Sequence, residues 1–176
     1  MMLSVIIILH NVTVLPLLVR SFGGIHLADK NNTEFITNED IWNAMISLLS
    51  EYEFPTDNET ANQAFMVYHY YSELESGGHE GLFNWCSMHI EALGVDRFFE
   101  ELVRALKEIN ATDYALIEEK YGLQMWKLYQ ALENGEIPEE EFYTIIEKAD
   151  SEYWQLDGKI GEVLEVYFVK IYKELG

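Results

Sequence analysis

Apolar residues recur every three to four positions along the chain from Thr37 onward, which is the spacing of one face of an α-helix. The clearest stripe lies at the C-terminus and comprises Leu156, Ile160, Val163, Leu164, Tyr167, Phe168, Ile171 and Leu175. Val166 and Val169 widen this face, which predicts a long C-terminal helix at the centre of the fold. No run after Thr37 demands a β-strand. The pattern therefore predicts an all-α, single-domain bundle of about seven helices.

Capping and turn residues divide the pattern into helices. Thr37, followed by Asp40 three residues later, forms a variant of the capping box and predicts a helix start. Asp57 or Asn58 can cap the next helix, because a short polar side chain accepts a hydrogen bond from the first turn. Gly122 is a candidate interruption of a later helix.

A double glycine, Gly77-Gly78, interrupts the helical pattern within YYSELESGGHEGLFNW, residues 70–85. The carboxylates and the histidine nearest to it are Glu73, Glu75, His79 and Glu80. A phosphate-binding loop would need a Lys-Ser/Thr ending or a preceding strand, and both are missing. A metal site would be indicated by a His-x-x-x-His or Glu-x-x-His pair, which is also missing. We therefore expect a corner between two helices, with no phosphate and no metal.

Residues 1–27 differ from the rest, because they are apolar and β-branched with one arginine as their charged residue. The residues that interrupt this segment as a transmembrane span are His10, Asn11 and Pro16. It also lacks the basic leading segment of a signal peptide. Three interpretations stay open: an extension outside the fold, a strand or helix packed on the domain, and a weak membrane anchor. Residues 28–37 are predicted to be a polar linker before a helical domain at 38–176.

The net charge is the outlier in the composition. The chain has 31 acidic and 11 basic residues among 176, a net charge of −20. Nucleic acid is a poor partner for such a chain, because phosphate binding needs Lys and Arg. The expected partners are cations, a basic protein surface, or a protein that itself binds nucleic acid. Cys86 is the single cysteine, so we expect an inert buried thiol and a cytoplasmic, reducing location.

The acidic residues are most concentrated from Ala131 to Asp157, where nine acids and one base, Lys148, give −8. Eight of these acids are the predicted partner-binding residues: Glu133, Glu136, Glu139, Glu140, Glu141, Glu147, Asp150 and Glu152. A second set of acids, Glu91, Glu100, Glu101, Glu108, Glu118 and Glu119, is diluted by Arg97, Arg104, Lys107 and Lys120. The alternative interpretation of the first set is an ordinary solvated helix surface.

The stretch ELESGGHEGLFNWCSMHIEALGVDRFFEELVRAL resembles the signature of the DNA-mimic protein family, whose members are small, acidic and all-helical. The residues that match the family pattern are Glu73, Gly77, Gly78, Phe83, Asn84 and, at the end of EALG, Gly94. The later stretch DSEYWQLDGKIGEVLEVYF is similar to the family's closing helix pair. Ser76, His79 and Gly81 depart from the pattern, which usually has Asn, Phe and Gln there. The resemblance covers about residues 38–175.

The resemblance implies a dimeric protein whose surface carboxylates imitate DNA phosphates and occupy the DNA-binding face of a regulator. The expected function is therefore non-catalytic binding of a basic, DNA-binding protein, with no cofactor and no direct contact with nucleic acid. A membrane partner is not expected for the helical domain, and the role of residues 1–27 toward a membrane stays open. One alternative is an antidote that neutralises a basic toxin such as a nuclease, since the same electrostatics would serve. The other is a metal-dependent enzyme, although no nucleophile pattern is recognisable.

Overall fold

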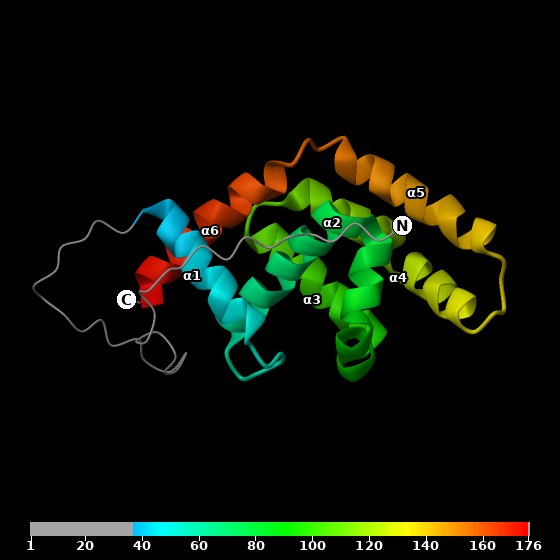
Figure 1. The fold of residues 1–176 in the computed structure, drawn as a ribbon, viewed down its shortest axis with the longest axis horizontal. Coiled ribbons are helices and arrows are strands. Elements are labelled where there is room, and N and C mark those ends of the chain that lie inside the picture. Colours follow the sequence, from blue (N-terminus) through cyan, green and yellow to red (C-terminus); the bar gives the residue numbers. More distant parts are fainter. Residues whose placement is uncertain (1–36, 176) are drawn as a thin grey trace, which may run out of the picture.

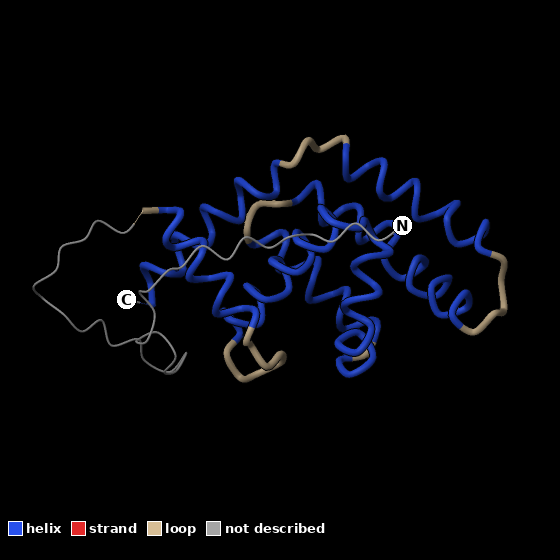
Figure 2. The backbone as a smooth tube through the Cα atoms, viewed as in Figure 1, coloured by secondary structure: helices blue, strands red, loops and turns tan. Residues whose placement is uncertain are grey.

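Six α-helices make up the part of the chain that the structure describes (Figure 1). This computed structural model describes residues 37–175, with side chains through Tyr172, so the extension 1–27 and nearly all of the linker lie outside the described residues. The helices are α1 (Asn38–Ser50), α2 (Glu59–Leu93), α3 (Val95–Glu108), α4 (Thr112–Glu133), α5 (Glu139–Trp154) and α6 (Lys159–Leu175). Figure 2 shows these helices joined by loops, with no strand between residues 37 and 175. The all-α prediction is confirmed.

The central element is α2 rather than the C-terminal helix. α2 packs against all five other helices, whereas α6 packs mainly against α1 and α2 at one end of the molecule (Figure 1). The predicted stripe of α6 is largely buried, with Ile160, Leu164 and Phe168 at 0% exposure, but Val166, predicted to widen it, is 72% exposed. Its predicted central position is wrong, because α2 has 35 residues against 17 in α6 and alone is long enough to reach every neighbour.

The helix count is six rather than about seven, because the helices expected on either side of the double glycine form one bent element, α2. Gly78 has a φ of 64° and a ψ of −162°, a backbone conformation that is essentially restricted to glycine. The predicted corner is therefore confirmed as a bend at Gly78. Gly122 does not interrupt α4: it is buried inside the helix, where a Cβ atom would approach the ring of Phe99 to 2.6 Å. This glycine lets α3 pack closely on α4.

The caps of α1 and α2 agree with the sequence pattern. Thr37 Oγ1 accepts a hydrogen bond from the Asp40 N–H at 3.1 Å, and the Asp40 carboxylate accepts one from the Thr37 N–H at 2.9 Å. Asn58 caps α2, since its Oδ1 accepts a hydrogen bond from the Ala61 N–H at 3.0 Å. Each such cap contributes about 0.5–2 kcal/mol to stability.

Aromatic packing holds α4 and α5 on the central helix. Phe83 of α2 meets Trp126 of α4 edge to face, with ring centroids 5.8 Å apart. Trp126 in turn stacks on Tyr129 at 5.4 Å, and Phe142 of α5 lies 6.1 Å from Tyr129. Fully burying a side chain of this kind contributes about 1.5–3 kcal/mol. The position of α5, which carries most of the predicted acidic residues, is thus fixed by the core.

Candidate functional site

The eight carboxylates predicted to bind a partner follow one another from the end of α4 through α5, and we call them the α5 acidic surface. Glu133 is the last residue of α4, and Glu136 lies in the loop between the two helices (Figure 1). The six on α5 are Glu139, Glu140, Glu141, Glu147, Asp150 and Glu152. The side chains of the first six residues of the surface, Glu133 through Glu147, are all exposed.

These glutamates point outward because the apolar residues of α5 occupy a single stripe. The buried stripe consists of Phe142, Ile146, Ala149 and Tyr153. Glu140 and Glu147 lie on the opposite side of the helix, about half a turn away from this stripe. The three glutamates of the first turn also meet the positive end of the helix dipole, which stabilises each by about 0.3–1 kcal/mol. Their presence in the first turn therefore has a local reason that does not depend on a partner.

Two of the eight carboxylates, Asp150 and Glu152, make contacts within the chain from opposite flanks of α5. Glu152 Oε1 accepts hydrogen bonds from Lys120 Nζ at 2.6 Å and from the Tyr121 hydroxyl at 2.7 Å, both on α4. The bonds from Lys120 and Tyr121 lower the pKa of Glu152. Asp150 faces α2 instead, where it contacts His79.

His79 of α2, Glu118 of α4 and Asp150 of α5 form a buried group that we call the His79 cluster. His79 Nδ1 lies 2.5 Å from Asp150 Oδ1, and Nε2 lies 2.9 Å from Glu118 Oε1. The backbone N–H of His79 donates to the same Asp150 oxygen at 3.0 Å. The side chains of His79 and Glu118 have no exposed surface, and that of Asp150 is 25% exposed. With a carboxylate at each ring nitrogen, the imidazole donates two hydrogen bonds, as its protonated form does.

The two carboxylates keep His79 charged. Burial lowers the pKa of a histidine, because it disfavours the charged ring. Attraction to Glu118, together with hydrogen bonds to Asp150 and Glu118, outweighs burial and raises the pKa of His79 to about 9. The ring is therefore an imidazolium at neutral pH, and it links three helices by charge-assisted hydrogen bonds.

The double glycine makes room for this cluster. A Cβ atom on Gly78 would lie 2.6 Å from Asp150 Oδ2, whereas a Cβ atom on Gly77 would meet nothing within 4 Å. The bend at Gly78 also turns the N–H of the next residue, His79, toward Asp150. Gly78 is thus the glycine that the geometry requires.

The sequence interpretation missed the His79 cluster. The expectation that Glu118 belongs to a surface set diluted by basic residues is wrong, because its residue is only 2% exposed. A signal was present: Glu118 stands four residues after Tyr114 and four before Gly122, both buried, so helical spacing places it in the same stripe. No comparable signal marks His79, since its partners lie 39 and 71 positions away in the sequence.

The remaining motif residues contribute to packing. Phe83 is buried against the aromatic rings of α4, and Asn84 Oδ1 accepts a hydrogen bond from the Tyr129 hydroxyl at 2.9 Å. Gly94, with a φ of 88°, separates α2 from α3. Glu73 is half-buried, and burial raises the pKa of its carboxyl. Phe83, Asn84 and Gly94 thus lie where α2 meets the neighbouring helices α3 and α4.

Two further titratable groups on α2 are buried without ionic partners. Burial, with the nearby charge of Glu73, raises the pKa of the Cys86 thiol, which disfavours the nucleophilic thiolate. Burial, with the charge of His89, lowers the pKa of His69 to about 4, so that this ring is neutral at pH 7. Neither environment activates its side chain for catalysis.

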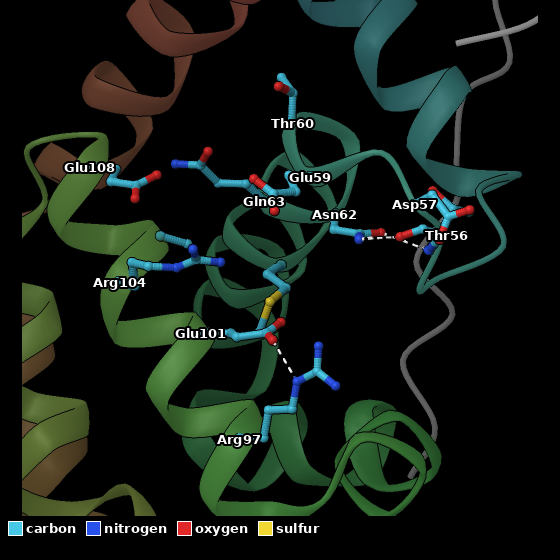
Figure 3. A pocket seen from close by; sticks show the side chains of 12 residues that line it. Thr56, Asp57, Glu59, Thr60, Asn62, Gln63, Arg97, Glu101, Arg104 and Glu108 are labelled. Carbon is cyan, nitrogen blue, oxygen red and sulfur yellow. Dashed lines mark hydrogen bonds and ion pairs between the residues drawn. The ribbon is translucent and has the colours of Figure 1, made fainter. Parts of the chain in front are cut away.

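A polar cavity of about 520 Å³ lies between α3 and the start of α2 (Figure 3). Arg97 and Arg104 project from α3 into it, and Arg97 Nε donates to Glu101 Oε1 at 2.7 Å. The acidic residues in its lining are Asp57, Glu59, Glu101 and Glu108. Four carboxylates against two guanidinium groups leave a net charge of −2, which is unfavourable for a phosphate. Among residues 37–175, no group of three or more His, Cys, Asp or Glu side chains is arranged to hold a metal ion.

Comparison with known proteins gives one family. The model of the DMP19-like protein family matches residues 57–171, which include all of α2 through α5 and most of α6. No curated protein and no solved structure is significantly similar to the chain. Within the described helices, none is both long enough and apolar enough to cross a membrane. Since the match spans well over half of the sequence, this chain belongs to the DMP19-like protein family.

Proposed function

We propose that this chain is a non-catalytic acidic protein that binds a basic, DNA-binding protein by presenting carboxylates in place of DNA phosphates. The observation that carries the proposal is the exposed part of the α5 acidic surface, Glu133 through Glu147. None of its six glutamates forms an ion pair with a described residue, so their charge is available to a partner. The family supports the proposal, because a DMP19-like description is consistent with DNA mimicry.

The density of charge on α5 supports mimicry of a DNA strand. At 1.5 Å per residue, the 16 residues of α5 span about 24 Å. A single strand of DNA carries a phosphate about every 3.4 Å, or about seven over that length. α5 carries six carboxylates over the same span, of which four are exposed and two, Asp150 and Glu152, bond within the chain. With Glu133 and Glu136 just before the helix, a groove of a DNA-binding protein lined with Lys and Arg would meet six exposed negative charges.

The net charge of the whole chain assists such an encounter. At −20, the molecule attracts a basic partner over a distance of about one Debye length, roughly 8 Å at physiological salt. Complementary charge of this kind raises the association rate and sets specificity more than it raises affinity. Binding through the α5 acidic surface should therefore weaken steeply as salt is added.

The experiment compares two variants in a pull-down from the native host, eluted with salt and analysed by mass spectrometry. The first variant reverses Glu136, Glu139, Glu140 and Glu141 to Lys, which changes the net charge by +8, from −20 to −12. It should lose the partner and keep the wild-type far-UV circular dichroism, because exposed glutamates do not hold the core together. Its melting temperature should fall, since three of the four reversed residues lie at the positive end of the α5 dipole.

The matched control reverses Glu91, Glu100, Glu108 and Asp113, which are also exposed and also change the charge by +8. It should retain the partner. Equal retention by both variants, or affinity that does not change between low and high salt, would rule out the α5 acidic surface as the binding site. A DNA-binding regulator in the eluate supports DNA mimicry, whereas a basic toxin would replace it with the antidote interpretation.

A further inference from the structure

A second surface on the molecule combines negative charge with aromatic rings. It is a groove of about 530 Å³ between the first turns of α1 and α6, with Trp42 and Tyr71 among its lining residues. Three carboxylates, those of Glu39, Glu162 and Glu165, also line it. α1 and α6 lie at the end of the molecule opposite the loop between α4 and α5 (Figure 1). The groove is therefore separate from the α5 acidic surface.

The aromatic part of the groove is held in place by the core. The rings of Trp42 and Tyr71 meet edge to face, with centroids 6.0 Å apart and planes at 80°. Trp42 also packs against the fully buried Phe168 at 5.3 Å. Both groove rings are only partly buried, so solvent or a ligand reaches them. Gly161 borders the ring of Tyr71: a Cβ atom there would be in van der Waals contact with the ring at 3.4 Å, so a larger side chain would fill the groove.

The charge of the groove favours a cation. Glu39, Glu162 and Glu165 are exposed and form no ion pair with the described residues, although Glu165 Oε1 accepts a hydrogen bond from Asn38 Nδ2 at 3.2 Å. The N-termini of α1 and α6 border the groove and each contribute about half a positive charge. Three carboxylates against these two helix ends leave about two negative charges.

We propose that this groove binds an arginine side chain of a protein partner. A guanidinium group is weakly hydrated, lies against aromatic rings and forms forked hydrogen bonds to carboxylates. The groove offers all of these contacts together, since Trp42 and Tyr71 lie beside Glu162 and Glu165. Lysine fits less well, because its ammonium is strongly hydrated and acts as a point charge. The site does not depend on binding at the α5 acidic surface.

The probe is the peptide acetyl-Gly-Arg-Gly-amide, titrated into the ¹⁵N-labelled full chain while the indole N–H signals of its four tryptophans are followed by NMR. Trp42→Phe assigns the Trp42 signal. That signal should shift in a saturable way with the arginine peptide, less with the lysine peptide, and not with the citrulline peptide, which has the same shape without the charge. An equal shift with citrulline, or no shift of Trp42, overturns the proposal.

Variants of the groove test the site itself. Removing two carboxylates, in Glu162→Gln with Glu165→Gln, should weaken peptide binding about five- to tenfold, from two exposed charge contacts of up to about threefold each. Gly161→Leu should abolish binding by filling the groove, and Trp154→Phe, at an exposed tryptophan on α5, should leave it unchanged. Unchanged affinity in the double Gln variant contradicts the proposal. The four-lysine variant of the α5 acidic surface should still bind the peptide; loss there would mean that only the overall charge matters.

Discussion

Glu118 and Glu140 are glutamates on neighbouring helices, but one is buried and the other is exposed. Glu118 is buried in the His79 cluster and hydrogen-bonded to an imidazolium, whereas Glu140 is exposed on the α5 acidic surface without an ionic partner in the described chain. Asp150 connects the two settings, because it belongs to the predicted surface but bonds to His79. The acidic residues of the chain therefore fall into two groups: one fixes the helices relative to each other, and the other is exposed and free to face a partner.

Removal of the buried cation should have the largest effect on the free energy of unfolding. His79→Leu leaves Glu118 and Asp150 without their shared partner, and breaking a buried ionic group in this way costs about 3–5 kcal/mol. Glu140→Gln, on the surface, should change the free energy of unfolding by no more than about 0.5 kcal/mol. Urea unfolding at pH 7, followed by circular dichroism, measures both. Similar small effects in the two variants would show that the cluster contributes no more than a surface glutamate.

The pH dependence of stability tests whether His79 is the charged group of the cluster. The pKa of His79 is raised in the folded state from its ordinary 6.5 to about 9, so its stabilising effect is fully present below pH 6.5 and is lost as the pH rises through about 9. A shift of this size corresponds to about 3 kcal/mol. The difference in unfolding free energy between the wild type and His79→Gln should therefore be large at pH 6 and small at pH 10. A difference that stays constant over this range would mean that His79 is not the group that titrates.

The double glycine offers a matched pair of substitutions. Gly78→Ala should destabilise the fold by about 1–3 kcal/mol, since an alanine is strained at a φ of 64° and its Cβ would contact Asp150 at 2.6 Å. Gly77→Ala should be neutral or slightly stabilising, because its Cβ would meet nothing within 4 Å and alanine is the better helix former. Thermal unfolding of the two variants gives the ranking. The reverse order would contradict the assignment of Gly78 as the required glycine.

The smallest expected effect comes from the exposed ion pair on the other flank of α5. Lys120→Met removes the charge that contacts Glu152, and both side chains are more than one-third exposed, at 56% and 39%. Such exposed pairs contribute little to stability and are screened by salt. The destabilisation should shrink further in 1 M NaCl. An effect as large as that of His79→Leu would remove the distinction between the buried and the exposed carboxylates.

Local patterns in the sequence were sufficient for the helices and for the residues that α5 buries. The caps at Thr37 and Asn58 depend on residues three positions apart, and the stripe from Phe142 to Tyr153 repeats at helical spacing, so both can be predicted without tertiary structure. The same spacing identifies which glutamates of α5 are exposed.

Contacts between segments far apart in the sequence could not be predicted from these local patterns. His79 meets Glu118 and Asp150 only after α2, α4 and α5 have packed, and nothing around the histidine distinguishes it from a surface residue beside a turn. The central position of α2 depends in the same way on packing, because amphipathic spacing describes a buried face but not how many helices cover it.

Because α5 is bonded on one flank to His79 and on the other to Lys120 and Tyr121, its rotation about its own axis is fixed before any partner arrives. The glutamates of the α5 acidic surface are therefore preorganised at the level of the backbone. A partner that binds there immobilises only their side chains, at about 0.5–1.5 kcal/mol each, and does not have to order a flexible segment. Complexes formed on such a surface should have similar backbone geometry in the free and bound states.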